Sequence, residues 1–308
     1  MHTQTAVTLA GLSLAYPLAL YTTAHTRASQ EHNRNHPQVV RTRMLHVSAV
    51  TLLSIALVAG TQPRAESHGP LETLLGTGIV PGFLYNRSSG DGHANWRPRA
   101  YLAQIARALL LVGRLFVAPL SDAALYYAVR GSAVVRGDAH SAFAHIWAVR
   151  DYVFAPITEE IVYTALLVTA AGSAVETDAL VAYVYLPLLF GVAHVHHAYE
   201  RYTSGGERNL FPLVCSTLVQ TAYTSLFGAI TNYTYIHTAH CLWACVLQHS
   251  LCNVLGLPGP SEVVQHYSVV RIPSRAVARR LVSLWGKAYI VLLPVGALWF
   301  VRELRAWE

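Results

Sequence analysis

Apolar runs long enough to cross a lipid bilayer recur along this sequence and limit its fold more than any other feature. Of its 308 residues 53% are apolar and only 12% are charged, too few charges for the solvated surface of a soluble protein of this length. Because roughly 20 helical residues span a bilayer core, we expect spanning helices near residues 6–24, 44–61, 100–119, 152–175, 179–199, 210–230, 239–258 and 284–301. The sequence therefore predicts an all-α, polytopic membrane bundle of about eight transmembrane helices, with residues 1–308 as a single membrane-embedded domain.

The first and third runs differ from the others in their charges. Met1 to Thr5 lack the basic patch and cleavage site of a removable signal peptide, so the first run is predicted to be a retained helix. Arg107 and Arg114 interrupt the third run at a spacing of two helical turns. This run is predicted either to span with one polar face or to lie in the membrane interface.

The basic residues are unevenly shared between the predicted loops. Most of the 22 Lys and Arg residues fall in odd-numbered loops, among them Arg34, Arg43 and Arg150. Since Lys and Arg collect in short cytosolic loops, the odd-numbered loops are predicted to be cytosolic, and the even-numbered loops and both termini lumenal. Two glycosylation sequons, Asn86-Arg87-Ser88 and Asn232-Tyr233-Thr234, fall in even-numbered loops on this arrangement.

The net charge of +6 is nearly all arginine in these loops, which attracts anionic lipid headgroups. The sequence has no dense basic run with interleaved aromatic residues and no Gly-rich phosphate loop, so no nucleic-acid partner is expected. The polar stretch from Thr61 to Arg99 is predicted to be a loop with one short helix.

Two adjacent acids, Glu159 and Glu160, interrupt the otherwise apolar segment from residue 155 to residue 171. A carboxylate at membrane depth costs about 3 kcal/mol even on lenient insertion scales, so an intramembrane acid indicates a functional site. Pro156, just before the acids, lacks the backbone N–H that a helix interior uses. The carbonyl groups that it frees are expected to need a polar or hydrated setting.

Two further apolar runs carry polar side chains at helical spacing. Phe190 and His194 share a helix face at i and i+4, and so do His249 and Asn253. A carboxylate in apolar surroundings holds a proton more readily than one in water, which suits it to take a proton from a water molecule. A neutral histidine can hold that water, and the His249/Asn253 pair can donate hydrogen bonds to a developing oxyanion. Because no serine or cysteine has an evident base, attack by water is favoured over a covalent intermediate.

Other polar residues of these runs are predicted to be structural. His196 and His197 are expected to form hydrogen bonds between helices. The four cysteines form no CxxC pair, so the sequence indicates neither a disulfide framework nor a thiolate zinc site. Cys245, His249 and Cys252 share a helix face and resemble a soft-metal cluster, but small apolar filler is the ordinary role of buried cysteine.

At these motifs the sequence resembles the type II CaaX prenyl endopeptidases, the Ras-converting enzymes, within the wider family of intramembrane glutamate proteases. The resemblance covers roughly residues 147–260, which we expect to form the catalytic core. It runs through four stretches: Ala155 to Tyr163 (APITEEIVY), Phe190 to His197 (FGVAHVHH), Tyr223 to Gly228 (YTSLFG) and Gln248 to Pro258 (QHSLCNVLGLP). Three ordered motifs with these flanks make the resemblance specific, whereas the outer helices carry no matching motif.

The resemblance implies an enzyme of the endoplasmic reticulum membrane that removes the last three residues of farnesylated or geranylgeranylated CaaX proteins, small GTPases among them. It implies neither a cofactor nor a metal. Glu159 would be the base that activates water, and His194 its partner. His249 and Asn253 would line the oxyanion hole, and Glu160 would support Glu159. The site is expected to open to the cytosolic side, and the prenyl chain to enter from the lipid.

One position departs from the family pattern. The pattern has an arginine four residues after the second glutamate, and this sequence has Thr164 there. Glu160 is therefore predicted either to be neutral or to be paired from another helix, since Thr164 can offer at most a hydroxyl hydrogen bond.

Two alternatives from other classes remain on the sequence alone. A zinc-dependent membrane protease could use Glu159, His194 and His249 as ligands, although the sequence has no HExxH motif. A non-catalytic scaffold could retain the fold, and Thr164 is the best support for it. A transporter with a proton-carrying acid has less support, because no pair of broken helices in matching halves is evident.

Overall fold

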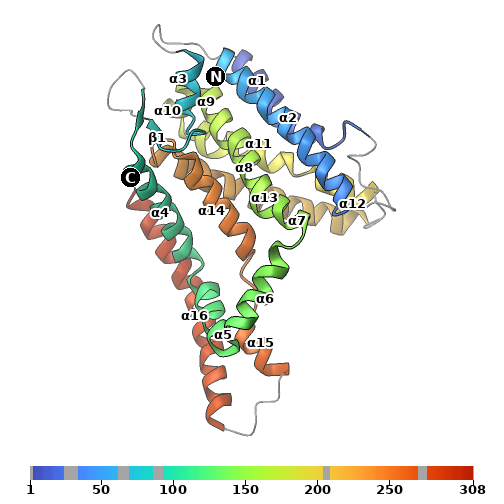
Figure 1. Ribbon diagram of the computed structural model, residues 1–308, viewed down its shortest axis with the longest axis vertical. Helices are drawn as coiled ribbons and strands as arrows, with labels where there is room; N and C mark the ends of the chain where they lie inside the picture. Colours follow the sequence, from blue (N-terminus) through green and yellow to red (C-terminus); the bar gives the residue numbers. More distant parts are fainter. Residues whose placement is uncertain are drawn as a thin grey trace.

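Helices make up most of the computed structural model, which describes residues 3–23, 34–61, 69–85, 93–203, 209–269 and 276–307 (Figure 1). In chain order the elements are α1 (Thr3–Ala19), α2 (Pro37–Thr61), α3 (Pro70–Gly76), β1 (Phe83–Tyr85), β2 (Ala94–Trp96), α4 (Pro98–Leu115), α5 (Val117–Arg130), α6 (Ser132–Phe143), α7 (Ile146–Val149), the π-helical η3 (Arg150–Phe154), α8 (Ala155–Glu159), the π-helical η4 (Glu160–Leu166), α9 (Leu167–Ala171), α10 (Ser173–Thr177), the π-helical η5 (Val181–Tyr185), α11 (Leu186–Ala193), α12 (His196–Thr203), α13 (Leu210–His237), α14 (Leu242–Leu255), α15 (Glu262–Val269) and α16 (Ala276–Arg305). The predicted helical membrane bundle is confirmed.

Each of the eight predicted apolar segments contains a helix, but not all of these helices are long enough to span a bilayer. Within the described ranges five helices are long and apolar enough, at residues 37–61, 146–171, 181–203, 210–237 and 279–305, and α4 with α5 gives a sixth if that bent pair is one span. The count of eight is reached only if α1, of 17 residues, and α14, of 14 residues, also enter the bilayer.

The third predicted run corresponds to α4, which meets α5 at a bend of 84°. Its arginines lie against the last helix and the C-terminal turn. The Arg107 guanidinium lies 4.0 Å from the centre of the Trp307 ring, and Arg114 Nη2 lies 3.5 Å from Glu303 Oε2. The polar face of α4 is therefore covered by protein, which reduces the cost of placing arginine in an apolar run.

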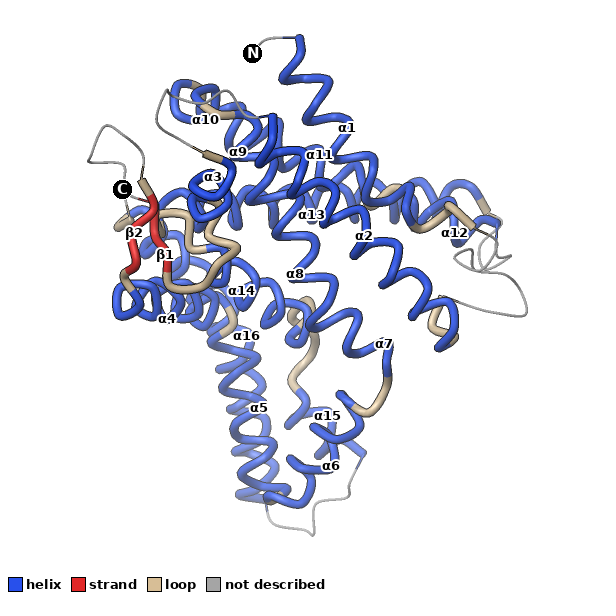
Figure 2. Tube along the Cα trace, turned by 45° about the horizontal axis from the view of Figure 1, so that its top comes forward, coloured by secondary structure: helices blue, strands red, loops and turns tan. Residues whose placement is uncertain are grey.

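The stretch that carries the two acids is the most enclosed of the five candidate spans. Its most apolar window is 61% buried, compared with 17% for α13 and 11% for the last span. Val162, Leu166 and Leu167 pack in the main core cluster with Leu9 and Leu12 of α1. Figure 2 shows α8 near the middle of the bundle, among α2, α13 and α14. The acids are thus held inside the protein and away from lipid.

The segments predicted to lie in even-numbered loops meet at one end of the molecule. The Tyr85 N–H of the β1–β2 hairpin donates to the Ala239 carbonyl oxygen (2.9 Å), and the Tyr233 hydroxyl donates to that of Leu304 (2.8 Å). In Figure 1 the hairpin, α3 and the C-terminus lie on the same side. The short helix predicted between residues 61 and 99 is present as α3, whereas the hairpin was not predicted. The Asn86 sequon lies outside the described residues.

The prediction that Asn232 lies in a loop is wrong. Helix α13 continues through this residue to His237, and Asn232 is buried, with its Nδ2 donating to the Ala182 carbonyl oxygen (2.8 Å). The apolar run ends near residue 230, but neighbouring helices supply hydrogen-bond partners to the polar residues that follow. Thr234 Oγ1, for example, donates to Gln248 Oε1 (3.0 Å). A buried asparagine bonded within a helix bundle is not available for glycosylation.

Candidate functional site

Local departures from α-helical geometry set the directions of the two acids. The π-helical turn η3 comes directly before α8, in which Pro156 has no backbone N–H to donate. The α-helical segment then ends at Glu159, and η4 begins at Glu160. Adjacent residues of a helix point roughly 100° apart, so the two carboxylates face different neighbours. Single π-helical turns of this kind are often found at functional sites.

His249, on α14, lies between the two carboxylates. Its Nδ1 is 2.8 Å from Glu160 Oε1, and its Nε2 is 3.8 Å from Glu159 Oε2. Glu160 is 2% exposed, whereas the Glu159 side chain is 16% exposed and lines a cavity. Because an ionised carboxylate only accepts hydrogen bonds, Nδ1 of His249 carries the proton between them.

The structure shows which groups bond Glu160 when position 164 is a threonine in place of the family's arginine. Thr164 Oγ1 donates to Glu160 Oε2 (2.7 Å), and His249 Nδ1 bonds the other oxygen from a different helix. Of the two alternatives predicted for Glu160, a neutral carboxyl or a partner from another helix, the structure shows the partner, and it also shows the hydroxyl hydrogen bond from Thr164. Both oxygens of Glu160 therefore have a hydrogen-bond partner in the protein.

His194 ends α11 and faces the same cavity. Its Nδ1 donates to the Phe190 carbonyl oxygen (2.9 Å), which leaves Nε2 of the neutral ring as an acceptor. The Phe190 ring packs edge-on against His194, with ring centres 4.8 Å apart. The predicted pairing of these two residues on one helix face is confirmed, and the phenylalanine holds the imidazole in place.

Close packing of α11 on α13 positions this histidine. A Cβ on Gly191 would come within 2.0 Å of Ser225 Oγ and 2.7 Å of the Thr221 carbonyl oxygen. The missing side chain thus lets the two backbones approach, as small residues do in membrane helix pairs. Phe227, also on α13, lies against His249, with ring centres 4.8 Å apart.

Asn253 follows His249 by one turn of α14 and is exposed to the cavity. Its Nδ2 donates to the Asp151 carbonyl oxygen (2.9 Å) on η3. An amide nitrogen has two N–H groups, so one remains for a ligand. Glu159, His194, His249 and Asn253 all line one cavity of about 680 Å³, while Glu160 lies behind His249.

The remaining wall of the cavity is mostly apolar. It includes Leu20, Met44, Val47, Phe116, Leu226 and Ile230. These residues come from the region of α1, from α2, from the α4–α5 bend and from α13. The cavity therefore offers acidic side chains and four histidines beside a large apolar surface, an arrangement suited to a substrate that is part peptide and part lipid.

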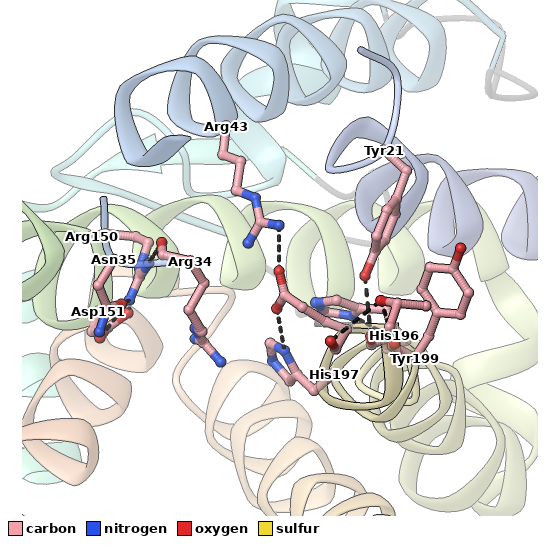
Figure 3. A network of polar contacts seen from close by, with 12 residues as sticks. Tyr21, Arg34, Asn35, Arg43, Arg150, Asp151, His196, His197 and Tyr199 are labelled. Carbon is pink, nitrogen blue, oxygen red and sulfur yellow. Dashed lines mark hydrogen bonds and ion pairs between the residues drawn. The ribbon is translucent and has the colours of Figure 1, made fainter. Parts of the chain in front are cut away.

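The sequence did not predict a second polar network at the cavity, shown in Figure 3. Arg43 of α2 and Glu200 of α12 form an ion pair in which each side chain is 7% exposed, and Arg34 and Arg150 also line the cavity. These arginines were interpreted only as markers of cytosolic loops. The available signal was the acid at residue 200 beside the histidine pair, which needs a cation if it is buried.

His196 and His197 lie in the same network. His196 Nδ1 bonds the Ala193 carbonyl oxygen (2.6 Å), and the Tyr21 hydroxyl donates to the His196 carbonyl oxygen (3.1 Å). His197 Nδ1 lies 4.0 Å from Glu200 Oε2. Only the His196 ring forms a hydrogen bond to another helix, through Ala193 of α11, whereas the His197 ring forms none among the described residues, and both side chains line the cavity. A purely structural role for the two histidines therefore stays a prediction.

Of the four cysteines, Cys252 lines the cavity and the other three do not. All four are free thiols, and Cys241 and Cys245 are buried. Across the described residues, no group of three or more His, Cys, Asp or Glu side chains is arranged to hold a metal ion. The face shared by Cys245, His249 and Cys252 is thus no ligand set, because His249 turns toward the two glutamates.

Comparison with known proteins gives consistent matches. The family model described as "Type II CAAX prenyl endopeptidase Rce1-like" matches residues 141–255. CAAX prenyl protease 2 of Saccharomyces cerevisiae is 31% identical over 93% of this chain and 90% of its own length. CAAX prenyl protease 2 of Homo sapiens is 33% identical over 76% of this chain and 66% of its own. The probable CAAX prenyl protease 2 of Schizosaccharomyces pombe is 25% identical over 79% of this chain and 77% of its own length. No solved structure gives a significant match.

Proposed function

The chain belongs to the family of the type II CAAX prenyl endopeptidases, and we propose that it removes the C-terminal tripeptide from prenylated CAAX proteins with water activated by Glu159. The observation that carries this mechanism is the state of the Glu159 carboxylate. It faces the cavity, forms no hydrogen bond among the described residues, and lies 3.8 Å from His249 Nε2. A general base needs an oxygen that is free to accept a proton from water.

The proposed water lies between Glu159 and His194. His194 donates its Nδ1 proton to the Phe190 carbonyl oxygen, so its Nε2 can accept a hydrogen bond from that water. Glu159 takes a proton as the water oxygen attacks the carbonyl carbon of the prenylated cysteine. The same proton then passes to the amine of the leaving tripeptide, which restores the carboxylate.

The oxyanion formed by this attack is stabilised by N–H donors of α14. Asn253 has one amide N–H besides the one that it gives to the Asp151 carbonyl oxygen. His249 donates from Nε2 when its ring carries two protons, and the carboxylate of Glu160 at Nδ1 supports that charged form. Removal of one such donor typically lowers kcat by about 10²- to 10³-fold.

The apolar cavity wall suits a farnesyl or geranylgeranyl chain, which gains about 0.8 kcal/mol for each methylene that leaves water. We place the protein in the endoplasmic reticulum membrane, with the cavity open to the cytosol and small GTPases among its substrates. The support for this orientation is that Arg34, Arg43 and Arg150, from predicted cytosolic segments, gather at the cavity. The single membrane domain with its catalytic core at residues 147–260 is part of the same proposal.

The test is release of the terminal tripeptide from a farnesylated CaaX peptide by purified protein in detergent, with and without chelator. We expect chelator-resistant cleavage by the wild type and none by Glu159→Ala. Glu176→Ala is the matched control, because Glu176 is an exposed acid on α10, away from the cavity. Chelator-sensitive cleavage would instead support the zinc alternative. Absence of wild-type cleavage on several prenylated peptides would support the scaffold.

A further inference from the structure

Three arginines reach the cavity wall from segments that are distant in the sequence. Arg34 precedes α2, Arg43 lies in its second turn, and Arg150 begins η3. Figure 3 shows the Arg34 side chain between the Arg150–Asp151 pair and Arg43. Arg43 and Arg150 each form an ion pair with a carboxylate of the protein, whereas Arg34 forms none among the described residues. This difference points to a ligand site at Arg34.

The charge of Arg43 is matched within the protein. Its Nη2 forms an ion pair with Glu200 Oε1, and both side chains are 7% exposed. The second carboxylate oxygen of Glu200 lies 4.0 Å from His197 Nδ1. A buried pair of this kind joins α2 to α12 and has little capacity for another anion.

Arg150 is also matched, and it supports Arg34. Its Nε and Nη2 donate to the two oxygens of Asp151 (2.7 and 3.0 Å). Two further N–H groups, one each on Nη1 and Nη2, donate to the Arg34 carbonyl oxygen and to Asn35 Oδ1, both at 3.0 Å. Arg150 therefore holds the backbone on which Arg34 is carried.

The Arg34 guanidinium has no hydrogen bond or ion pair within the part of the chain that the structure describes. Its side chain is exposed to the cavity and partly enclosed by protein. That partial burial, and then the nearby Arg150 guanidinium, lower the pKa of Arg34. The carboxylates of Glu200 and Asp151 oppose this lowering without cancelling it, and an anion bound directly to the guanidinium would raise the pKa of Arg34.

We propose that Arg34 binds the C-terminal carboxylate of the tripeptide that the enzyme removes. This inference rests on the proposed function, since it names the group of that substrate that the cavity wall recognises. The carboxylate is present in every CaaX substrate, whatever the last residue. Three extended residues place it at most about 10–11 Å from the bond that is cut, within a cavity that both Glu159 and Arg34 line.

The chemistry of the two groups fits. A guanidinium is always charged and presents paired N–H donors that match the two oxygens of a carboxylate. Because Arg150 and Asn35 hold the backbone at Arg34, less conformational freedom is lost when the substrate binds. An internal peptide has no carboxylate at this distance, so the same contact selects chain ends.

The test compares farnesylated CaaX peptides that end in a free carboxylate with the same peptides ending in a carboxamide. We expect wild type to prefer the acid. Arg34→Gln should lower kcat/KM for the acid by roughly 10- to 100-fold, mainly through KM, and leave the amide unchanged. Arg34→Lys should keep part of the preference. Arg41→Gln, an exposed arginine on α2 outside the cavity, is the control with the same change in charge and should match wild type.

An unchanged acid-to-amide ratio in Arg34→Gln would overturn the inference. Equal loss on both peptides would also overturn it, because a structural role or a contact with a lipid phosphate does not depend on the peptide terminus. If wild type cleaves the peptides and Arg34→Gln gives either of these results, only the carboxylate site is wrong and the proposed function still holds. If wild type cuts neither peptide, the proposed function fails and the carboxylate site fails with it.

Discussion

Asp122, on α5, and Glu159, at the end of α8, are both carboxylates enclosed by helices, but their surroundings differ. Asp122 is 3% exposed and accepts three hydrogen bonds, from Ser261 Oγ (2.5 Å), from the Glu262 N–H (2.6 Å) and from Trp285 Nε1 (2.6 Å). Glu159 has a cavity on one side and, within the described chain, no hydrogen bond.

The difference shows how one residue type serves two purposes in the same bundle. With its oxygens filled by donors from α15 and α16, Asp122 joins three helices and has no lone pair facing a cavity. Glu159 keeps its oxygens available for a water molecule. Glu160 is between these cases, because its oxygens are filled but one of the donors is His249, which also faces the cavity.

The largest expected effect is on catalysis, from Glu159→Gln. The amide keeps the shape of the side chain but cannot take a proton from water, so turnover should fall by roughly 10²- to 10⁴-fold. Stability should stay the same or rise, because removal of an unpaired charge from an enclosed site relieves its desolvation. Peptide cleavage and thermal unfolding of the detergent-solubilised protein measure the two effects. A marked loss of stability would show that Glu159 is structural, as Asp122 is.

The matched change, Asp122→Asn, should give the opposite result. An asparagine presents its NH₂ group to at least one of the three donors and loses that hydrogen bond. We expect about 2–3 kcal/mol less stability, with turnover of the folded protein unchanged because Asp122 does not line the cavity. Unfolding in denaturant and activity per folded molecule test this. Loss of turnover without loss of stability would remove the distinction between the two carboxylates.

The smallest effect is expected from Thr164→Val. The substitution keeps the shape but leaves Glu160 Oε2 without its hydroxyl donor, so one oxygen of Glu160 loses its partner. Less firm placement of His249 should lower turnover by about tenfold, which corresponds to about 1.4 kcal/mol. Thr164→Ser retains the hydroxyl and should restore the rate. If valine and serine behave alike, the hydroxyl has no part in positioning the histidine.

Much of the candidate site was predictable from sequence because its residues are expensive at membrane depth. Glu159, Glu160, His194, His249 and Asn253 stand out as polar groups in apolar runs, and the structure brings four of them to one cavity and the fifth behind His249. The helices were also predictable, because a long apolar run in lipid can satisfy its backbone hydrogen bonds only as a helix or as part of a closed barrel.

Other features depended on contacts between residues far apart in the chain. The ion pair of Arg43 with Glu200 joins positions 157 residues apart, and the contact of Arg150 with Asn35 joins positions 115 apart. An arginine in a loop looks the same in the sequence whether its side chain faces lipid headgroups or a cavity. The sequence therefore supported only the interpretation of these arginines as markers of cytosolic loops. Asn232 was misplaced for a related reason, since its partner, the Ala182 carbonyl, belongs to another helix.

The sequence by itself determined that this chain is a helical membrane protein with acids and histidines on three of its apolar runs, because hydropathy and helical spacing are local properties. Only the tertiary structure decided which acid is satisfied and which is available. His249 approaches Glu160 within hydrogen-bonding distance and Glu159 less closely. Among the described residues, Arg34 has no ion pair, while Arg43 and Arg150 each have one. Such differences of about 1 Å between neighbouring groups arise from packing between helices, which no single segment encodes.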